Sequence, residues 1–179
     1  KTDFTNLDED NKKMNIFFWD RGGIKFDDWI KHINHEDINE ILYFPIPDYG
    51  RNKSNIDNYL KNKDLNITLI KENFLTKSKF LDLISKCNVF ISPRKKEGIG
   101  MTIVEAISRG MFVVGFNAST LNEYITDQKI GFLFDEKSIN KIDINNIIEN
   151  YEFRKSIAQE NYVNWLGQKK KILPFFNNR

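Results

Sequence analysis

The stretch that most constrains the fold is residues 89–115, which reads as a strand, a glycine-containing loop, a helix and a second strand. Val89-Phe90-Ile91 is a short apolar run typical of a buried strand, and Ser92-Pro93 ends it because proline has no N–H to donate. Phe112-Val113-Val114 is the next such run. A unit of this kind is typical of a parallel sheet covered by helices.

The segment between these strands predicts a short helix that begins at Met101. The apolar positions that we expect to face the core are Met101, Ile103, Val104 and Ile107. The polar positions that we expect on the opposite stripe are Thr102, Glu105 and Arg109. Gly110 is expected to end the helix, because the residue past a helix end often needs a positive φ.

The start of this helix has the composition of an anion site. Its first N–H groups have no partner within the helix and carry a partial positive charge, which suits a phosphate. Gly98 and Gly100 let a ligand approach the backbone closely. Glu97 precedes the helix and Glu105 lies in its second turn, so the two carboxylates are expected roughly 10 Å apart. This pattern predicts a compact site for a nucleotide sugar.

Strands and helices alternate along the rest of the chain. The other predicted strands are residues 15–19, 41–44, 67–70 and 131–134. The other helical patterns lie around Phe26–Ile33, 53–62 (with Ile56 and Leu60 as its apolar face), Phe80–Ile84, 136–149 and 151–166. This order predicts an α/β fold, a doubly wound, Rossmann-like parallel sheet of about six strands with helices on both faces. The loops at 21–25, 93–100 and 117–120 all follow strands and are expected at one edge of it.

Composition excludes several classes of function. A net charge of +2 gives no case for a nucleic-acid partner. The one cysteine, Cys87, lies in an apolar setting and is expected to be a buried, reduced thiol. No apolar run approaches eighteen residues, so we expect a cytoplasmic protein. We expect a linker segment at 1–13, a nucleotide-sugar-binding domain at 14–166 and a tail at 167–179, and the initial Lys1 suggests a piece of a longer chain.

Residues 92–106, Ser-Pro-Arg-Lys-Lys-Glu-Gly-Ile-Gly-Met-Thr-Ile-Val-Glu-Ala, resemble a known motif. It is the Glu-x7-Glu signature of retaining glycosyltransferases of the GT-B fold, family 4 type, also called glycosyl transferases group 1. The continuation from Gly110 to Phe134 is similar to the same family, including a helix that bears Glu123. The resemblance spans about residues 14–166, the donor-binding C-terminal half of a GT-B fold.

The resemblance implies roles for residues around the motif. Glu105 would bind the ribose hydroxyls, and Glu97 would lie near the hydroxyls of the donor sugar. The backbone N–H groups implied to hold the diphosphate and sugar are those of Gly98, Ile99, Gly100, Met101 and Thr102. The alternative is that Glu97 and Glu105 are both exposed to solvent and have no role in binding.

The family also has a basic pair after its first strand, which neutralises the leaving diphosphate without a metal. Arg21 and Lys25 resemble that pair, with a spacing one residue shorter than usual and Asp20 in place of a small residue. The implied catalytic residues are therefore Glu97, Arg21 and Lys25. In the alternative reading Arg21 pairs with Asp20 or Asp27, and Lys25 is solvated.

Several neighbouring residues have more ordinary explanations. Thr120 and Glu123 form the pattern of a capping box, where the family often has Gly-Gly before the helix. Arg94 is balanced between a ligand contact and a surface role. His32 and His35 are expected to be a solvent-facing pair near a helix end and not metal ligands. By analogy with the family, the base would lie near Phe74-Leu75.

The resemblance implies a donor-binding domain that transfers a sugar, with retention, from a UDP- or GDP-type donor and without a cofactor or metal. The acceptor, a sugar or lipid-linked sugar in surface polysaccharide or glycoconjugate synthesis, would be held by a missing N-terminal domain, so this chain alone is expected to be weak or inactive. Lys169–Lys171 before Phe175-Phe176 leave peripheral contact with the inner membrane face open. The alternatives are a non-catalytic nucleotide-sugar-binding module and a sugar-nucleotide epimerase of the same fold. A glycoside hydrolase that uses Glu97 and Glu105 fits less well.

Overall fold

The computed structural model describes residues 12–98 and 100–177, without the side chains of Asn62, Trp165 and 169–177. Most of the expected leading segment 1–13, the residue Ile99 and the side chains of Lys169–Lys171 and Phe175-Phe176 therefore lie outside the described part. The strands are β1 (Met14–Trp19), β2 (Ile38–Phe44), β3 (Ile67–Leu69), β4 (Val89–Ile91), β5 (Phe112–Phe116) and β6 (Gly131–Phe134). They form a six-stranded sheet in the order β3-β2-β1-β4-β5-β6, and every pair is parallel. The doubly wound α/β fold expected from the sequence is confirmed.

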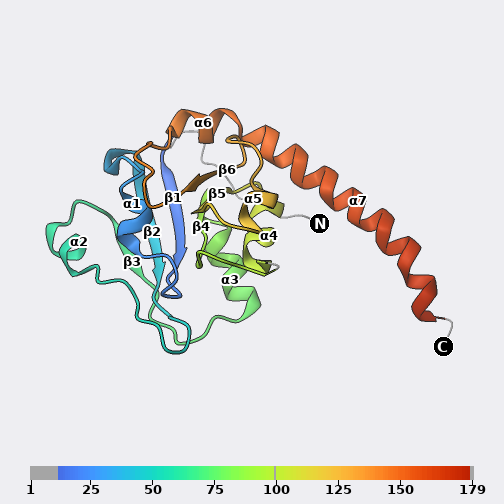
Figure 1. The fold of residues 1–179 in the computed structure, drawn as a ribbon, viewed down its shortest axis with the longest axis horizontal. Helices are drawn as coiled ribbons and strands as arrows, with labels where there is room; N and C mark the ends of the chain where they lie inside the picture. The colour runs from blue at the N-terminus through green and yellow to red at the C-terminus, as the bar shows by residue number, and fades with distance from the viewer. Residues whose placement is uncertain (1–11, 99, 178–179) are drawn as a thin grey trace.

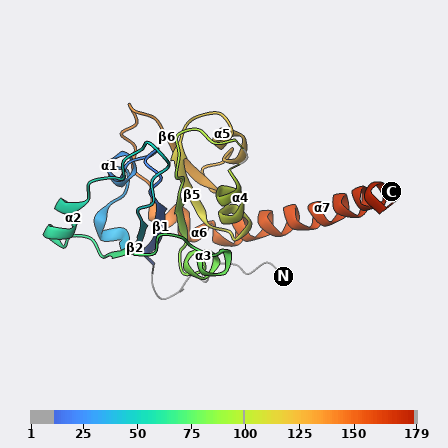
Figure 2. The same ribbon diagram turned by 90° about the horizontal axis from the view of Figure 1, so that it is seen from below.

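Helices cover both faces of this sheet (Figures 1 and 2). They are α1 (Phe26–Ile30), α2 (Asp57–Asn62), α3 (Lys77–Ile84), α4 (Met101–Ser108), α5 (Leu121–Tyr124), α6 (Ile144–Glu149) and α7 (Tyr151–Asn177), with a 3-10 turn at His35–Asp37. Buried residues of α1 and α6 belong to one core, and those of α3, α4 and α5 belong to the other. The two layers follow from right-handed crossovers in both directions from the centre of the sheet.

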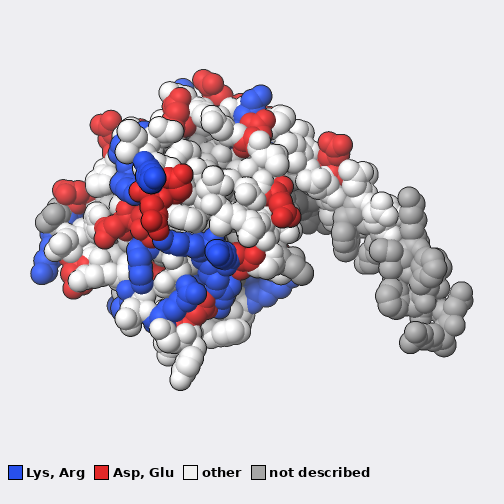
Figure 3. All heavy atoms as spheres, in the orientation of Figure 1, with Lys and Arg blue, Asp and Glu red and all other residues white. Residues whose placement is uncertain are grey.

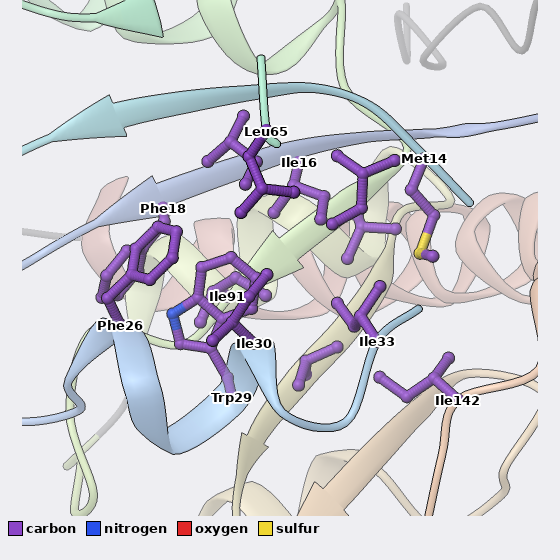
Figure 4. Packing of buried hydrophobic residues seen from close by; sticks show 14 of the residues in the cluster. Met14, Ile16, Phe18, Phe26, Trp29, Ile30, Ile33, Leu65, Ile91 and Ile142 are labelled. Carbon is purple, nitrogen blue, oxygen red and sulfur yellow. The ribbon is translucent and has the colours of Figure 1, made fainter. Parts of the chain in front are cut away.

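Alternate residues of each strand supply the two cores. On β1, Ile16 and Phe18 face the α1 side, where Trp29 of α1 packs edge-on against Phe18, with their ring centroids 5.4 Å apart (Figure 4). Phe17 points to the other face and stacks on Phe90 of β4. Because side chains alternate along a strand, an unbroken apolar run is what a strand covered on both faces requires.

Two helical faces differ from the sequence-based expectation. In α4 the buried side chains are Ile103 and Ala106, whereas Met101 is 70% exposed and Val104 also reaches solvent. Ile103 and Ile107 contact the core as expected, but the expectation was wrong for Met101 and Val104. Both sides of this two-turn helix carry apolar residues, so periodicity alone does not choose between them. In α2 Leu60 is exposed, and Ile56, just before the helix, is buried as expected.

The last two helices have different bounds from those predicted. Residues 136–143 form no helix, and α6 begins at Ile144, where the Asp143 side chain caps it. Helix α7 continues to Asn177 instead of ending near residue 166, and its distal part extends away from the sheet in both views (Figures 1 and 2). Its first turns are anchored by the buried Arg154, whose guanidinium donates to the carbonyl oxygens of Gly110, Lys129 and Ile147.

Candidate functional site

The centre of the sheet determines where a site can form. The strand order runs outward from β1 in one direction and from β4 in the other, so the chain reverses between these neighbours. In open parallel sheets this switch point, at the carboxyl ends of the strands, is where ligands bind. The loops 20–25 after β1 and 92–100 after β4 both begin there. Figure 3 shows Lys and Arg side chains, with Asp and Glu among them, gathered on the lower part of the drawn face.

Glycines bring the loops together. Gly22 has a φ of +75°, and a Cβ at this position would lie 2.8 Å from the carbonyl oxygen of Asn52. A Cβ on Gly23 would lie 2.9 Å from the Cα of Arg94 and 3.0 Å from the carbonyl oxygen of Pro93. Because these neighbours are backbone atoms, no side-chain movement relieves the clash. The two glycines therefore permit direct contact between loop 20–25 and the loops that follow β2 and β4.

Asp20 holds the first loop from within. Its side chain is fully buried, and its oxygens accept hydrogen bonds from the Gly22 N–H at 2.9 Å, the Tyr43 hydroxyl at 2.8 Å and the Ser54 N–H at 2.5 Å. Burial, and then the nearby Asp20 carboxylate, raise the pKa of Tyr43 well above its usual range. Asp20, which departs from the family pattern, thus ties β1, β2 and the β2–α2 loop together.

Four charged residues form a continuous ion chain across the carboxyl edge. Arg21 donates through Nε and Nη2 to Oδ1 of Asp48, at 2.8 and 2.6 Å. Arg94 donates through Nε to Oδ2 and through Nη2 to Oδ1 of the same carboxylate, at 2.7 and 2.9 Å. Nη1 of Arg94 contacts both oxygens of Glu97 at 3.2 and 3.3 Å. Arg21, Asp48, Arg94 and Glu97 are called the ion chain below.

Within the ion chain, Asp48 and Arg94 each stabilise the charged form of the other. Hydrogen bonds from Arg94, and then from Arg21, lower the pKa of Asp48, and the contact with Asp48 raises the pKa of Arg94. The Glu97 side chain is only 9% exposed, so the bland reading of a solvated glutamate is wrong for this residue. Arg21 pairs with Asp48 and not with Asp20 or Asp27, and its guanidinium lies 4.7 Å from the centre of the Trp19 ring.

Lys25 lies at the end of the same loop, before α1. Its ammonium group donates to the carbonyl oxygen of Asn52, and its backbone N–H donates to Asp28 at 2.8 Å. Its charge is therefore directed at the β2–α2 loop, next to the ion chain, and no carboxylate among the described residues neutralises it within ion-pair distance. Lys25 is thus partly exposed and also bonded to the β2–α2 loop, so the alternative of a solvated lysine is neither confirmed nor contradicted.

The start of α4 is arranged without a side-chain cap. Gly100 precedes the helix with a φ of +53°, and no side chain among the described residues caps this end. A Cβ on Gly98 would meet nothing within 4 Å, so there is open space beside this residue. Met101 and Thr102 form the first turn, and Ile99 lies outside the described residues. Within the part of the chain that the structure describes, the N–H groups of Met101 and Thr102 have no acceptor, which suits an oxygen from outside the chain.

Glu105 is separate from the ion chain. Its carboxylate accepts a hydrogen bond from Nε of Arg109, one helical turn later, at 3.0 Å. Glu105 stays 30% exposed while Arg109 is nearly buried, so the pair fixes the direction of a carboxylate that solvent still reaches. The bland expectation of a simply solvated glutamate does not hold here.

The loop after β5 corrects another expectation. Thr120 does not cap α5 through its side chain, so the predicted capping box with Glu123 is wrong. Thr120 has a φ of +79° and a ψ of −53°, a conformation that suits glycine far better than a β-branched residue. The backbone conformation at residue 120 favours glycine, which the family often has at this turn. Thr120 adopts this conformation with strain.

The histidines are not a pair at the surface. His35 is exposed as expected, but His32 is fully buried between the rings of Phe132 and Phe134, with ring centroids 5.2 Å apart in both cases. Its Nδ1 is 2.7 Å from the carbonyl oxygen of Asn140, and burial lowers its pKa. Within the described residues, no three His, Cys, Asp or Glu side chains are grouped to hold a metal ion. Cys87 is buried as predicted, and burial raises the pKa of its thiol.

Sequence reasoning missed the two middle members of the ion chain. Asp48 was not predicted as a site residue, because it is one polar residue in a proline-containing loop. For Arg94 the sequence did not distinguish a ligand contact from a surface role. A usable signal was that Asp48 follows β2, the neighbour of β1 in any such sheet, so its loop ends at the same edge as Arg21.

A comparison with protein families identifies the chain. The family model described as glycosyl transferases group 1 matches residues 28–163. The chain belongs to this family. The match includes the Glu97–Glu105 segment and begins three residues beyond Lys25, so the basic pair lies outside it. A comparison of this group 1 chain with curated protein sequences returns no match.

Solved structures share the fold of this group 1 chain. It resembles a crystal structure of TarM with a TM-score of 0.62 and 20% identity, over 99% of this chain and 37% of TarM. It resembles the catalytic domain of cholesterol-α-glucosyltransferase from Helicobacter pylori with a TM-score of 0.51 and 15% identity, over 87% of this chain and 98% of that one. A third likeness is to a mutant of S. aureus TarM in complex with fondaparinux, α-GlcNAc-glycerol and UDP, with a TM-score of 0.52 and 16% identity, over 93% of this chain and 35% of that one. The fold is thus that of the C-terminal half of a GT-B glycosyltransferase, and the chain spans little more than a third of TarM.

The described residues contain no helix that is both long and apolar enough to cross a membrane.

Proposed function

We propose that this chain is the donor-binding domain of a retaining glycosyltransferase that uses a nucleoside diphosphate sugar. The observation that carries the proposal is the meeting of a basic loop and an uncapped helix start at the switch point of the sheet. Arg21 and Lys25 follow β1, Glu97 follows β4, and α4 begins beside them with Gly98 facing open space. A diphosphate needs this combination of cations and free N–H groups.

The chemistry asked of these residues is charge neutralisation. When the bond between the anomeric carbon and the phosphate oxygen breaks, negative charge develops on the leaving diphosphate. Arg21 is held through Nε and Nη2, and its Nη1 has no hydrogen-bond acceptor among the described residues, which leaves one edge for a phosphate oxygen. Lys25 and the N–H groups at the start of α4 would add to the same stabilisation without a metal.

The two glutamates would position the donor. Glu105, oriented by Arg109, would accept hydrogen bonds from the ribose hydroxyls, and Glu97, oriented by Arg94, would do so from the sugar. Carboxylates suit this role because they accept from neighbouring hydroxyls and cannot compete as donors. Correct placement of the anomeric carbon lowers the entropic cost of its transfer to an acceptor hydroxyl.

The acceptor would be a sugar or lipid-linked sugar held by a further domain, as in a complete GT-B enzyme, in the synthesis of surface polysaccharide or glycoconjugate. The chain spans only part of TarM, which accords with a division of labour between donor and acceptor domains. The base would be uracil or guanine, near Phe74 and Leu75 after β3, where Phe74 is exposed.

A thermal-shift titration tests this proposal. The chain is titrated with UDP, GDP and ADP, and with their sugar conjugates, with and without magnesium. A ligand that binds only the folded state raises the unfolding midpoint by mass action. We expect one nucleotide to raise the midpoint equally in both conditions.

Two variants sharpen the test. Glu105→Gln removes a charged acceptor and is expected to weaken nucleotide binding about 10- to 150-fold, since a hydrogen bond to a charged group contributes roughly 1.5–3 kcal/mol. Glu149→Gln, on an exposed glutamate at the end of α6, is the matched control and should bind as the unaltered chain does. Unchanged affinity of the Glu105 variant would remove the ribose role. Binding without turnover by any longer form that carries the acceptor domain would favour a non-catalytic module.

A further inference from the structure

The ion chain connects two residues that do not contact each other. Arg21 belongs to the loop after β1, and Glu97 belongs to the loop after β4. Among the described residues, the ion pairs that join them pass through Asp48, from the loop after β2, and through Arg94. The outer members are the two that the proposed function uses, whereas the inner members have their charged groups directed at other protein residues.

All three guanidinium nitrogens of Arg94 donate to carboxylates. Its Nε and Nη2 form a fork on the two oxygens of Asp48, and its Nη1 is on Glu97. A guanidinium can hold two carboxylates in one plane in this way, and a lysine ammonium cannot, because its donors radiate from a single point. Arg94 is therefore an unsuitable ligand for a phosphate and well suited to hold a carboxylate in place.

The backbone under the ion chain is also fixed. A Cβ built on Gly23 would lie only 2.9 Å from the Cα of Arg94. The backbones of the loops after β1 and β4 are therefore in contact beneath their side chains. Asp48 accepts from both arginines, and its backbone N–H donates to the carbonyl oxygen of Arg21 at 3.0 Å. The side-chain links and the backbone links thus join the same three loops.

We propose that Asp48 and Arg94 are positioning residues, which set the Arg21 guanidinium and the Glu97 carboxylate in one fixed relation. The inference rests on the proposed function for its purpose: the cation at the leaving diphosphate and the carboxylate at the sugar are aligned as one unit. A change at Glu97 is then felt at Arg21 through Arg94 and Asp48.

The coupling is measurable without any ligand. The Nε–Hε group of Arg21 donates to Asp48, so its signal in a nitrogen–proton correlation spectrum reports on that bond. Arg21→Lys identifies the signal by removing it. We expect Glu97→Gln to move the Arg21 signal by more than its line width, and we expect the same change in an Arg94→Gln background to leave it in place.

A charge control separates coupling from general electrostatics. Lys96→Gln removes a charge beside Glu97 in the sequence, on an exposed side chain outside the ion chain, and should leave the Arg21 signal where it is. The inference is overturned if Glu97→Gln leaves the Arg21 signal unchanged. It is also overturned if Glu97→Gln moves that signal by the same amount in the Arg94→Gln background. If Arg94→Gln fails to fold, Arg94→Lys replaces it, because it keeps the charge and loses the fork.

Nucleotide binding provides the second readout. With UDP or GDP as the probe in calorimetry, Arg21→Gln and Glu97→Gln should combine non-additively, by about tenfold in Kd, and should become additive when Arg94 is Gln. Tighter binding by Asp48→Asn would mean that Asp48 competes with the diphosphate for Arg21, and would overturn the positioning role. Absence of binding by the unaltered chain would count against the proposed function alone, because the spectroscopic coupling does not need a ligand.

Discussion

The Asp20 carboxylate accepts the Tyr43 hydroxyl at 2.8 Å, in a fully buried position at the carboxyl ends of two adjacent strands. The same carboxylate also holds the N–H groups of Gly22 and Ser54. A buried polar group of this kind stabilises the fold only while all its partners are present. Asp20 directly precedes Arg21 in the chain. The hydrogen bonds that fix Asp20 therefore also fix the backbone position of Arg21.

Replacement of Asp20 by Asn should therefore destabilise the protein. An amide presents two N–H donors toward at least one donor of the protein, so we expect a loss of about 2–4 kcal/mol in the free energy of unfolding. Tyr43→Phe, which removes one partner of the buried carboxylate, should lose about 1.5–3 kcal/mol. Urea denaturation measures both. Tyr49→Phe, on a fully exposed tyrosine, is the control and should change nothing measurable. An Asp20→Asn variant as stable as the parent would contradict this account.

Gly23 and Gly98 should respond to alanine in opposite ways. A Cβ on Gly23 meets the backbone of Pro93 and Arg94, so Gly23→Ala should separate the loops and cost about 1–3 kcal/mol. A Cβ on Gly98 meets nothing, so Gly98→Ala should keep the stability and weaken nucleotide binding. Denaturation and titration calorimetry on both variants distinguish the effects.

Gly167→Ala serves as the reference for these glycine variants. It lies in α7 with open space around it and should be stabilised by roughly 0.5–1 kcal/mol, as expected for alanine in a helix. The assignment of Gly23 to loop packing would be wrong if its alanine variant also gained stability.

Stability should fall in mild acid because of His32. A carbonyl oxygen can only accept, so Nδ1 carries the proton toward Asn140. Nε2 then has a buried lone pair, for which the described residues offer no hydrogen-bond donor. Burial lowers the pKa of His32 in the folded state below its unfolded value of about 6.5. The neutral form is thus favoured by folding, so this contribution is complete above pH ~6.5 and is lost as the pH falls below that value, with a limiting slope of about 1.4 kcal/mol per pH unit.

The matching experiment follows the free energy of unfolding between about pH 5 and 7.5. His32→Gln should flatten the profile across this window, and His35→Gln, on the exposed histidine, should keep it. Equal slopes in the His32 variant and the parent would show that other groups cause the dependence.

Thr120→Gly should stabilise the protein. A β-branched residue with a φ of +79° carries strain of roughly 1–3 kcal/mol, and glycine relieves it at an entropic cost of about 1 kcal/mol. We expect a net gain of about 1 kcal/mol in the free energy of unfolding, measured by urea denaturation. Ser119→Gly, at the preceding position, lacks that relief and should lose stability.

The strands were predictable from the sequence because runs such as Val89-Phe90-Ile91 have apolar side chains for both faces of a covered sheet. The exposed side of α4 was not, because Met101 and Ile103 are equally apolar and only the tertiary structure decides between them. The Glu97–Glu105 segment was found through its resemblance to a family. Asp48 could not be predicted, because its role depends on arginines from two other loops. No local sequence pattern indicates that these three side chains contact one another. Helix α7 was predicted too short, since it continues from Tyr151 to Asn177 and the predicted tail 167–179 is helical as far as residue 177.

The strand order also has a consequence for biosynthesis. Strand β1 precedes the other strands that the structure describes, and its second neighbour in the sheet is β4, where Ile16 pairs with Val89. As the polypeptide leaves the ribosome, β1 and β2 can pair early, but the other side of β1 then remains an unpaired, apolar edge until β4 emerges. Such an edge is a template for association between nascent chains. The edge of β1 that ends in the middle of the finished sheet is therefore exposed to such association during synthesis.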